Sequence, residues 1–209
     1  MWSLILICCA VGYLFGSLPP GYFAGRIAGV DIRKAGSGNI GATNVLRVLG
    51  KRWGYPVFFI DAFKGFAAVR IAFFLLRYWP EARPYGEYLA ILTAIMCVIG
   101  HSFPIWLRFK GGKGVATSAG AIFGLLPLAL PFVLLVWVVV FYSTRYVSVA
   151  SVVAAISLPV VVSLFAHWNF VDTYALIYFS ILIAALVIWR HRSNLTRLLN
   201  GTEQRFNRK

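Results

Sequence analysis

The 209-residue sequence has few acidic residues and little charge of either sign. Six Asp and Glu residues stand against 20 Lys and Arg, and charged residues make up 12% of the chain. This scarcity excludes an ordinary soluble domain, because 60% of the residues are hydrophobic and the mean hydropathy is +0.80. We therefore expect an integral membrane protein, whose apolar surface is covered by the lipid bilayer.

The chain is also poor in cysteine. Cys8, Cys9 and Cys97 lie in apolar runs, without the spacing of a metal site or of a disulfide framework. We expect them to fill space in the interior, and we expect neither a metal nor a cofactor. The net charge of +14 would indicate nucleic acid in a soluble protein. In a membrane protein it indicates basic cytoplasmic loops, so we expect no nucleic-acid partner.

Long apolar stretches predict the membrane spans. The first covers residues 1–25, and it lacks the basic start and the cleavage site of a removed signal peptide. The others are residues 53–76, 88–107, 115–144, 146–171 and 173–189. Within 53–76, Asp61 and Lys64 are three residues apart, so they can pair on one face of a helix. We favour such a structural pair over a path for a solute.

The stretch 115–144 decides the orientation of everything after it. As one straight helix it would be about 45 Å long, well beyond a hydrocarbon core of about 30 Å. A hairpin broken near Pro127 places 16 Lys and Arg on one side against Arg77 and Arg83 on the other, whereas a single helix gives nine against nine. Because cytoplasmic loops are basic, we predict an all-α polytopic protein with about seven transmembrane helices, its N-terminus outside and its C-terminus in the cytoplasm.

This topology brings three polar stretches of one domain, residues 1–209, to the cytoplasmic face. They are residues 36–52, 107–117 and 190–201, and they combine Gly, Ser, Asn and cations without a carboxylate. Glycines allow backbone N–H groups to approach an anion, and Ser and Asn side chains add donors. The pattern is suited to phosphate oxygens. The basic tail after Asn194 is typical of a segment that lies on anionic lipid.

The first stretch contains Ser37, Asn39, Asn44 and Arg47. Its glycines formally spell the G-x-G-x-x-G of a dinucleotide site, but no apolar strand precedes them, so we discount that interpretation. The arginine can hold a phosphate through two parallel hydrogen bonds. The alternative is a glycine-rich turn beside an ordinary cytoplasmic arginine.

The second stretch places two lysines among glycines: Lys110, Gly111, Gly112, Lys113 and Gly114. It resembles half of an ATP-binding P-loop, but Leu107 stands where the leading glycine belongs, so we do not expect ATP. The glycines are typical of an anion cradle, and a helix that starts at Val115 would point its N-terminus at the same place. The alternative is a lysine pair that reaches from a helix end to the membrane surface.

The third stretch contains His191 and Asn194, which share one face if the helix continues through them. A positively charged end to a membrane span explains Arg190 and Arg192, but it explains neither of these two residues.

In this order the motifs resemble the bacterial acyl-phosphate:glycerol-3-phosphate acyltransferase family. The resemblance rests on residues 37–44 with Arg47, on residues 100–101 and 109–117, and on residues 191–197. It implies a seven-helix protein of the bacterial inner membrane with a cytoplasm-facing site. It also implies transfer of a fatty acyl group from acyl phosphate to the primary hydroxyl of glycerol 3-phosphate. The products would be lysophosphatidic acid and phosphate, in the first acylation of phospholipid biosynthesis.

The resemblance implies catalytic roles for Ser37, Arg47, Lys110 and His191. The expected substrate and phosphate ligands are Ser37, Asn39, Asn44, Arg47, Lys110, Gly111, Gly112, Lys113, Ser148, His191 and Asn194. Ser148 rests on the short match Tyr146-Val147-Ser148. No stretch offers a carboxylate as general base, which leaves His191 or, as the resemblance implies, a substrate phosphate oxygen to take the hydroxyl proton.

Two other functions stay open. A membrane carrier of phosphate or an organophosphate would place polar, broken helices at the midplane, and here Asp61, Lys64 and Arg70 are the deep charges. A scaffold that binds anionic lipid would leave the glycine spacing unexplained. The expected partners are acyl phosphate, glycerol 3-phosphate and the lipid bilayer. A soluble enzyme that produces acyl phosphate is a further candidate.

Overall fold

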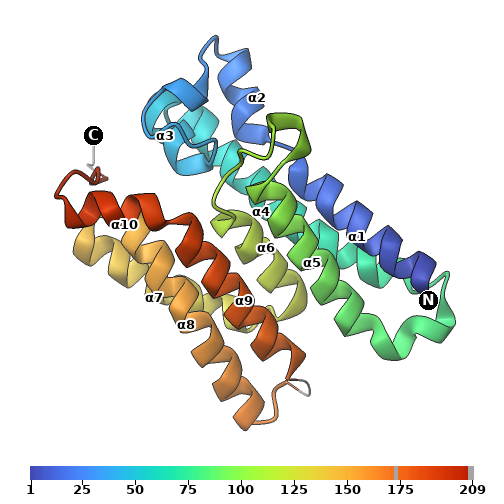
Figure 1. The fold of residues 1–209 in the computed structure, drawn as a ribbon. Helices are drawn as coiled ribbons and strands as arrows, with labels where there is room; N and C mark the ends of the chain where they lie inside the picture. The colour runs from blue at the N-terminus through green and yellow to red at the C-terminus, as the bar shows by residue number, and fades with distance from the viewer. Residues whose placement is uncertain (172–173, 207–209) are drawn as a thin grey trace. The chain divides into compact units, whose positions relative to one another are not determined.

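The computed structural model describes residues 1–171 and 174–206. All regular structure in these residues is helical, with ten α-helices and three short 3-10 helices, which confirms the all-α expectation (Figure 1). The chain forms two compact units, Met1–Leu125 and Leu126–Lys209, which are described separately below.

The first unit holds six α-helices. They are α1 (Trp2–Ser17), α2 (Pro20–Ile27), α3 (Ala42–Leu49), α4 (Lys51–Leu75), α5 (Gly86–Ser102) and α6 (Val115–Leu125). The 3-10 helices are η1 (Ile32–Lys34), η2 (Pro80–Tyr85) and η3 (Ile105–Leu107). The expected first span is broken after Ser17, because Pro19 and Pro20 cannot donate the backbone hydrogen bonds that would continue α1.

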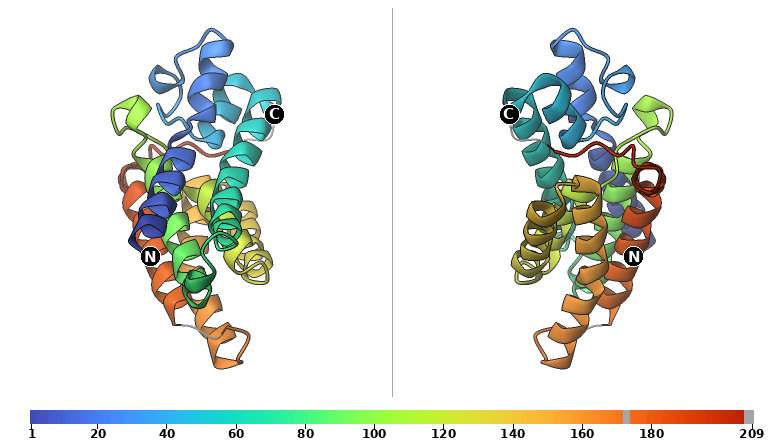
Figure 2. Two further views of the ribbon diagram at one scale, coloured as in Figure 1. Left: turned by 90° about the vertical axis from the view of Figure 1, so that its right-hand side faces the viewer. Right: turned by 90° about the vertical axis from the view of Figure 1, so that its left-hand side faces the viewer.

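Close backbone contacts hold the long helices of this unit together. Helix α1 packs along α5, and α4 packs along α6 (Figures 1 and 2). A Cβ atom at Gly16 would collide with the Cys97 carbonyl oxygen, and one at Gly120 would collide with the Ala62 carbonyl oxygen. Small residues at these positions therefore allow the helix axes to approach, as is common between helices in membranes.

An apolar cluster supports the first polar stretch. Buried Ile32, Ile40 and Val45 from this stretch and its flanks pack with Val57 and Leu107, and Trp53 covers them in part. Burial of these side chains fixes the loop before α3 against the start of α4, because apolar contact stabilises the packed arrangement.

The second unit consists of α7 (Ala129–Thr144), α8 (Val147–His167), α9 (Ala175–Arg190) and α10 (Arg192–Leu199). Helix α7 packs on α8, and α8 packs on α9 (Figures 1 and 2). Helices α9 and α10 meet at a bend of 52°. The start of the predicted span 173–189 lies outside the described residues, and the helix begins at Ala175.

The predicted break near Pro127 is confirmed, since α6 ends at Leu125 and α7 begins at Ala129. The reversal of the chain at this break stays a prediction.

Several helices are suited to a bilayer. Among the described residues, Trp2–Ile27 taken across its break, Pro80–Leu107 and Val147–His167 are long and apolar enough to cross a membrane, and α9 with α10 is a fourth if the bent pair counts as one. Helix α4 has 25 residues but contains five charged side chains, and α6 and α7 are shorter. Exposed Phe59, Phe63 and Leu135 fit contact with lipid. The count of seven spans stays a prediction.

Candidate functional site

Asn44 organises the loop that precedes α3. Its side chain is buried, and its Oδ1 accepts a hydrogen bond from the Ser37 backbone N–H at 2.8 Å. Its Nδ2 donates to the carbonyls of Asn39 at 2.8 Å, Ala35 at 3.0 Å and Ile32 at 3.2 Å. The expected phosphate ligand therefore uses both ends of its amide to hold the chain's own backbone.

Asn39 and the glycines complete this loop. Asn39 Oδ1 accepts from the Gly41 N–H at 2.8 Å, which is the local bond of an Asx turn. Gly36 has φ +59°, and a Cβ atom there would collide with Asn44 Oδ1, so the left-handed turn requires glycine. Ser37 and Arg47 are exposed at this loop and at α3. Asn39, Asn44 and Gly36 thus hold the shape of the loop, whereas the side chains of Ser37 and Arg47 are exposed at its surface.

The second stretch folds back onto the end of α5. The N–H of Gly111 donates to the Ser102 carbonyl at 3.2 Å, and the N–H of Gly112 donates to the His101 carbonyl at 3.0 Å. A Cβ atom at Gly112 would collide with the His101 ring. These two glycines hold the loop closed through their amides, a use that the expected anion cradle did not include.

The lysines of this stretch lie at the surface of the loop. Lys110 is exposed and Lys113 is half-buried. Arg108 and Phe109 precede Lys110 with φ of +52° and +61°, a left-handed conformation that is uncommon for residues with side chains. Helix α6 begins at Val115, as predicted.

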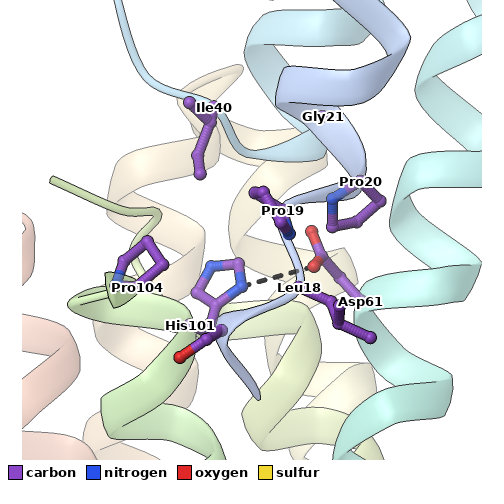
Figure 3. A pocket seen from close by; sticks show the side chains of 9 residues that line it. Leu18, Pro19, Pro20, Gly21, Ile40, Asp61, His101 and Pro104 are labelled. Carbon is purple, nitrogen blue, oxygen red and sulfur yellow. Dashed lines mark ion pairs between the residues drawn. The ribbon is translucent and has the colours of Figure 1, made fainter. Parts of the chain in front are cut away.

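The predicted pair of Asp61 and Lys64 is confirmed and has a third member. Lys64 Nζ lies 2.8 Å from Asp61 Oδ1. His101 Nδ1 lies 3.3 Å from the same oxygen, and this ion pair is the one drawn in Figure 3. Lys64 Nζ also donates to the Leu18 carbonyl at 2.9 Å. The cluster is buried, and it satisfies a carbonyl that the break after α1 leaves without a helical partner. The sequence placed His101 in a motif but did not predict this contact.

A narrow pocket lies beside this cluster (Figure 3). Its walls come from the α1–α2 break, from the two polar stretches of this unit or their flanks, and from the charged cluster. They are Ser17, Leu18, Pro19, Pro20, Gly21, Ile40, Asp61, His101 and Pro104. Ile40 belongs to the first stretch and Pro104 precedes the second, so the pocket is where the structure brings these two segments together.

In the second unit, buried His191 lies at the bend between α9 and α10. Its Nδ1 is 2.8 Å from the Val187 carbonyl. A carbonyl can only accept, so Nδ1 carries the proton and the lone pair of the neutral ring is on Nε2. The bend ends the straight helix on which His191 and Asn194 would have shared a face, and the Asn194 N–H donates to the His191 carbonyl at 2.8 Å.

Ser148 and Asn194 meet at a carboxylate that sequence reasoning missed. Glu203 Oε1 accepts from Asn194 Nδ2 at 2.6 Å and from Ser148 Oγ at 2.8 Å. Glu203 Oε2 accepts from Arg197 Nε at 2.9 Å. Burial alone would raise the pKa of Glu203, but the hydrogen bonds from Asn194, Ser148 and Arg197 outweigh it and lower the pKa below its ordinary value. The sequence offered one signal for this contact: Glu203 is an isolated acidic residue in a basic tail.

Comparisons with known proteins agree with one another. The family model described as glycerol-3-phosphate acyltransferase matches residues 6–201. A protein named glycerol-3-phosphate acyltransferase from Aquifex aeolicus (strain VF5) is 42% identical, over 99% of this chain and 100% of that protein. One of the same name from Desulforamulus reducens is 44% identical, over 94% of this chain and 92% of that protein.

Two solved structures are also similar to the chain. The crystal structure of PlsY, an integral membrane glycerol 3-phosphate acyltransferase, in its glycerol 3-phosphate form has a TM-score of 0.84 at 39% identity, and the match covers 97% of this chain and 96% of that one. The lysophosphatidic acid form has a TM-score of 0.81 at 38% identity, with coverage of 97% and 95%.

Proposed function

The chain belongs to the glycerol-3-phosphate acyltransferase family, and on this premise we propose that it transfers a fatty acyl group from acyl phosphate to glycerol 3-phosphate. The names of the relatives support the acceptor, and the glycerol 3-phosphate and lysophosphatidic acid forms of PlsY support the acceptor and the product. Acyl phosphate as the donor is the step that we add to the family assignment.

The observation that carries the donor is the chemistry of the three stretches. They offer cations, hydroxyls and amides, and none of them contains a carboxylate. A reaction between two phosphate-bearing substrates needs such groups, because cations offset the repulsion between the two anions. Acyl phosphate already carries a good leaving group, so the transfer needs no acyl-enzyme intermediate.

The reaction balances without a cofactor. The primary hydroxyl oxygen of glycerol 3-phosphate attacks the acyl carbon, the bond from that carbon to the phosphate oxygen breaks, and phosphate leaves with the electron pair. The hydroxyl proton goes to a phosphate oxygen, or to His191 Nε2, which carries the lone pair when the ring is neutral and Nδ1 donates to the Val187 carbonyl. Cations near the leaving phosphate stabilise the charge that develops on it.

We assign the exposed groups Ser37, Arg47 and Lys110 to the phosphates, with Lys113 beside them. Ser148, His191 and Asn194 complete the proposed set. Asn39, Asn44, Gly111 and Gly112 act in the structure through their bonds to the backbone, so we assign them to shaping the two loops. Their contribution to substrate binding is thus indirect in this proposal.

We place the enzyme in the bacterial inner membrane with seven spans, an outside N-terminus and the three stretches in the cytoplasm. The charge distribution of 16 cations against two supports this orientation, as does the observed helix break at Pro127. A cysteine introduced at Ser193 should react with a membrane-impermeant reagent in inside-out vesicles and not in intact spheroplasts. The reverse labelling pattern would show that the third stretch faces the outside and would contradict the proposed orientation.

The carrier alternative has less support. Two of the three deep charges that it needs are Asp61 and Lys64, and they bind each other, His101 and the backbone carbonyl of Leu18. Lys64 satisfies a carbonyl at the end of α1, and its charge is paired with Asp61. These contacts fit a structural role better than a path for a solute.

The donor is tested by giving the purified protein glycerol 3-phosphate with either acyl phosphate or acyl-CoA. We expect lysophosphatidic acid and inorganic phosphate in equal amounts from acyl phosphate, and no product from acyl-CoA. Product from acyl-CoA alone would support glycerol 3-phosphate as the acceptor and would contradict acyl phosphate as the donor. Movement of glycerol 3-phosphate into vesicles without acylation would favour the carrier.

A further inference from the structure

One carboxylate of the C-terminal tail collects three donors from two helices. Ser148 comes from the start of α8, and Asn194 and Arg197 come from α10. Their hydroxyl, amide and guanidinium groups reach Glu203 at 2.8, 2.6 and 2.9 Å. The Glu203 side chain is 8% exposed, so it depends on these donors in place of water.

This donor set fits any anion with several acceptor oxygens. A carboxylate and an ionised phosphate group both present acceptor oxygens, and guanidinium groups recognise either of them. Ser148 and Asn194 are also residues that the proposed function assigns to substrate phosphate. Two anions cannot share these donors, since like charges at hydrogen-bonding distance repel each other.

The tail is held on both sides of Glu203. Before it, the Thr202 N–H donates to the Arg197 carbonyl at 2.8 Å. After it, Arg205 Nε donates to Tyr146 Oη at 3.0 Å, and the Phe206 N–H donates to the Arg145 carbonyl at 2.8 Å. The Phe206 ring also contacts Phe141, with 5.8 Å between centroids. These anchors keep the carboxylate close to its donors.

We propose that Glu203 is a displaceable occupant of an anion site formed by Ser148, Asn194 and Arg197, and that it competes with a substrate phosphate group for these donors. The proposal rests on the proposed function for the identity of the competing phosphate. In this role Glu203 sets the apparent affinity for phosphate-bearing substrates, because a ligand binds only to the fraction of molecules in which the site is open.

The test uses inorganic phosphate as the probe. Its binding is measured by titration calorimetry on the full-length protein, and its inhibition constant is measured in the acyltransfer assay. Glu203→Gln removes the charge and keeps the shape of the side chain. We expect it to lower both the phosphate dissociation constant and the KM of a phosphate substrate by about tenfold, since hydrogen bonds to charged groups are stronger than those to neutral ones.

Two further variants make the result specific. Phe206→Ala loosens the tail and leaves the donors intact, so it should shift both constants in the same direction by a smaller factor. Glu81→Gln removes one negative charge from an exposed position in η2 and should change neither constant.

The outcomes separate the two levels of the proposal. Weaker phosphate binding in Glu203→Gln would show that the carboxylate positions the donors, and unchanged binding would show that no competition exists; either result overturns the inference. If Glu203→Gln fails to fold, Phe206→Ala takes its place: a lower phosphate dissociation constant supports the competition, and an equal or higher one overturns it. If wild-type protein makes no product from acyl phosphate, the proposed donor fails, while calorimetry still decides whether Glu203 competes with phosphate.

Discussion

The loop around Asn44 and the tail around Glu203 both gather polar side chains that the motifs assign to phosphate binding, yet they use them differently. Asn44 makes four hydrogen bonds to backbone groups of its own loop. Ser148 and Asn194 instead donate to the side-chain carboxylate of Glu203. Bonds of the first kind are lost only if the loop unfolds, whereas bonds of the second kind can pass to another anion. The same residue type, asparagine, thus serves structure in one unit and anion recognition in the other.

The largest expected effect comes from an exposed cation. Lys110→Ala should abolish turnover and leave the fold intact, with a loss of about 10²- to 10³-fold or more in kcat, because a charge that stabilises the leaving phosphate is removed. The measurement is the initial rate of product formation, with circular dichroism as the check on folding. Lys34→Ala, an exposed cation of the same unit, is the matched control. Near-normal activity of Lys110→Ala would show that Lys110 does not stabilise the leaving phosphate.

A large loss of stability is expected at the buried charged cluster. Asp61→Ala leaves Lys64 buried without its carboxylate, so it should lower the free energy of unfolding by about 3–5 kcal/mol. Thermal unfolding in detergent measures the loss. If Asp61→Ala kept its stability but lost transport or turnover, the cluster would have a functional role and not the structural one proposed here.

The two asparagines give the sharpest form of the comparison. Asn44→Ala should lower the free energy of unfolding by about 2–3 kcal/mol, because it leaves buried backbone groups unpaired. Asn194→Ala should lower kcat/KM by about tenfold with a smaller change in stability, since its bond goes to an exchangeable anion. Unfolding curves and rates are measured for both variants. Equal stability losses would mean that the contrast between the units is wrong.

The smallest expected effect is a pH dependence. The pKa of Glu203 is lowered in the folded protein from an ordinary value of 4.5, so its contribution to stability is present above pH 4.5 and is lost as the pH falls through the lowered pKa. Wild type should therefore lose more stability than Glu203→Gln between pH 6 and pH 3. Parallel melting curves of the two proteins over this range would contradict the prediction.

The parts that the sequence predicted are those that depend on local pattern. Apolar runs located the long helices, Pro127 located a break, and a spacing of three residues predicted the pair of Asp61 and Lys64. The break after Ser17 was missed although Pro19 and Pro20 signal it, because the run of apolar residues around them was taken as one span.

The missed contacts join residues that are far apart in the chain. His101 reaches Asp61 across 40 positions, and Glu203 reaches Ser148 across 55. Neither contact has a periodic signature, since each depends on how helices pack and on where the tail returns. The use of the Gly111 and Gly112 amides was missed for a related reason: motif spacing does not reveal which backbone groups the loop itself consumes.

We propose that this membrane protein recognises its acceptor, glycerol 3-phosphate, through the phosphate group. This proposal is tested most directly by titrating the purified protein with glycerol 3-phosphate and, in parallel, with glycerol, and by recording the heat of binding. We expect saturable binding of glycerol 3-phosphate that weakens in Lys110→Ala, and no detectable binding of glycerol. Equal binding of the two compounds, or binding that is indifferent to Lys110, would contradict it.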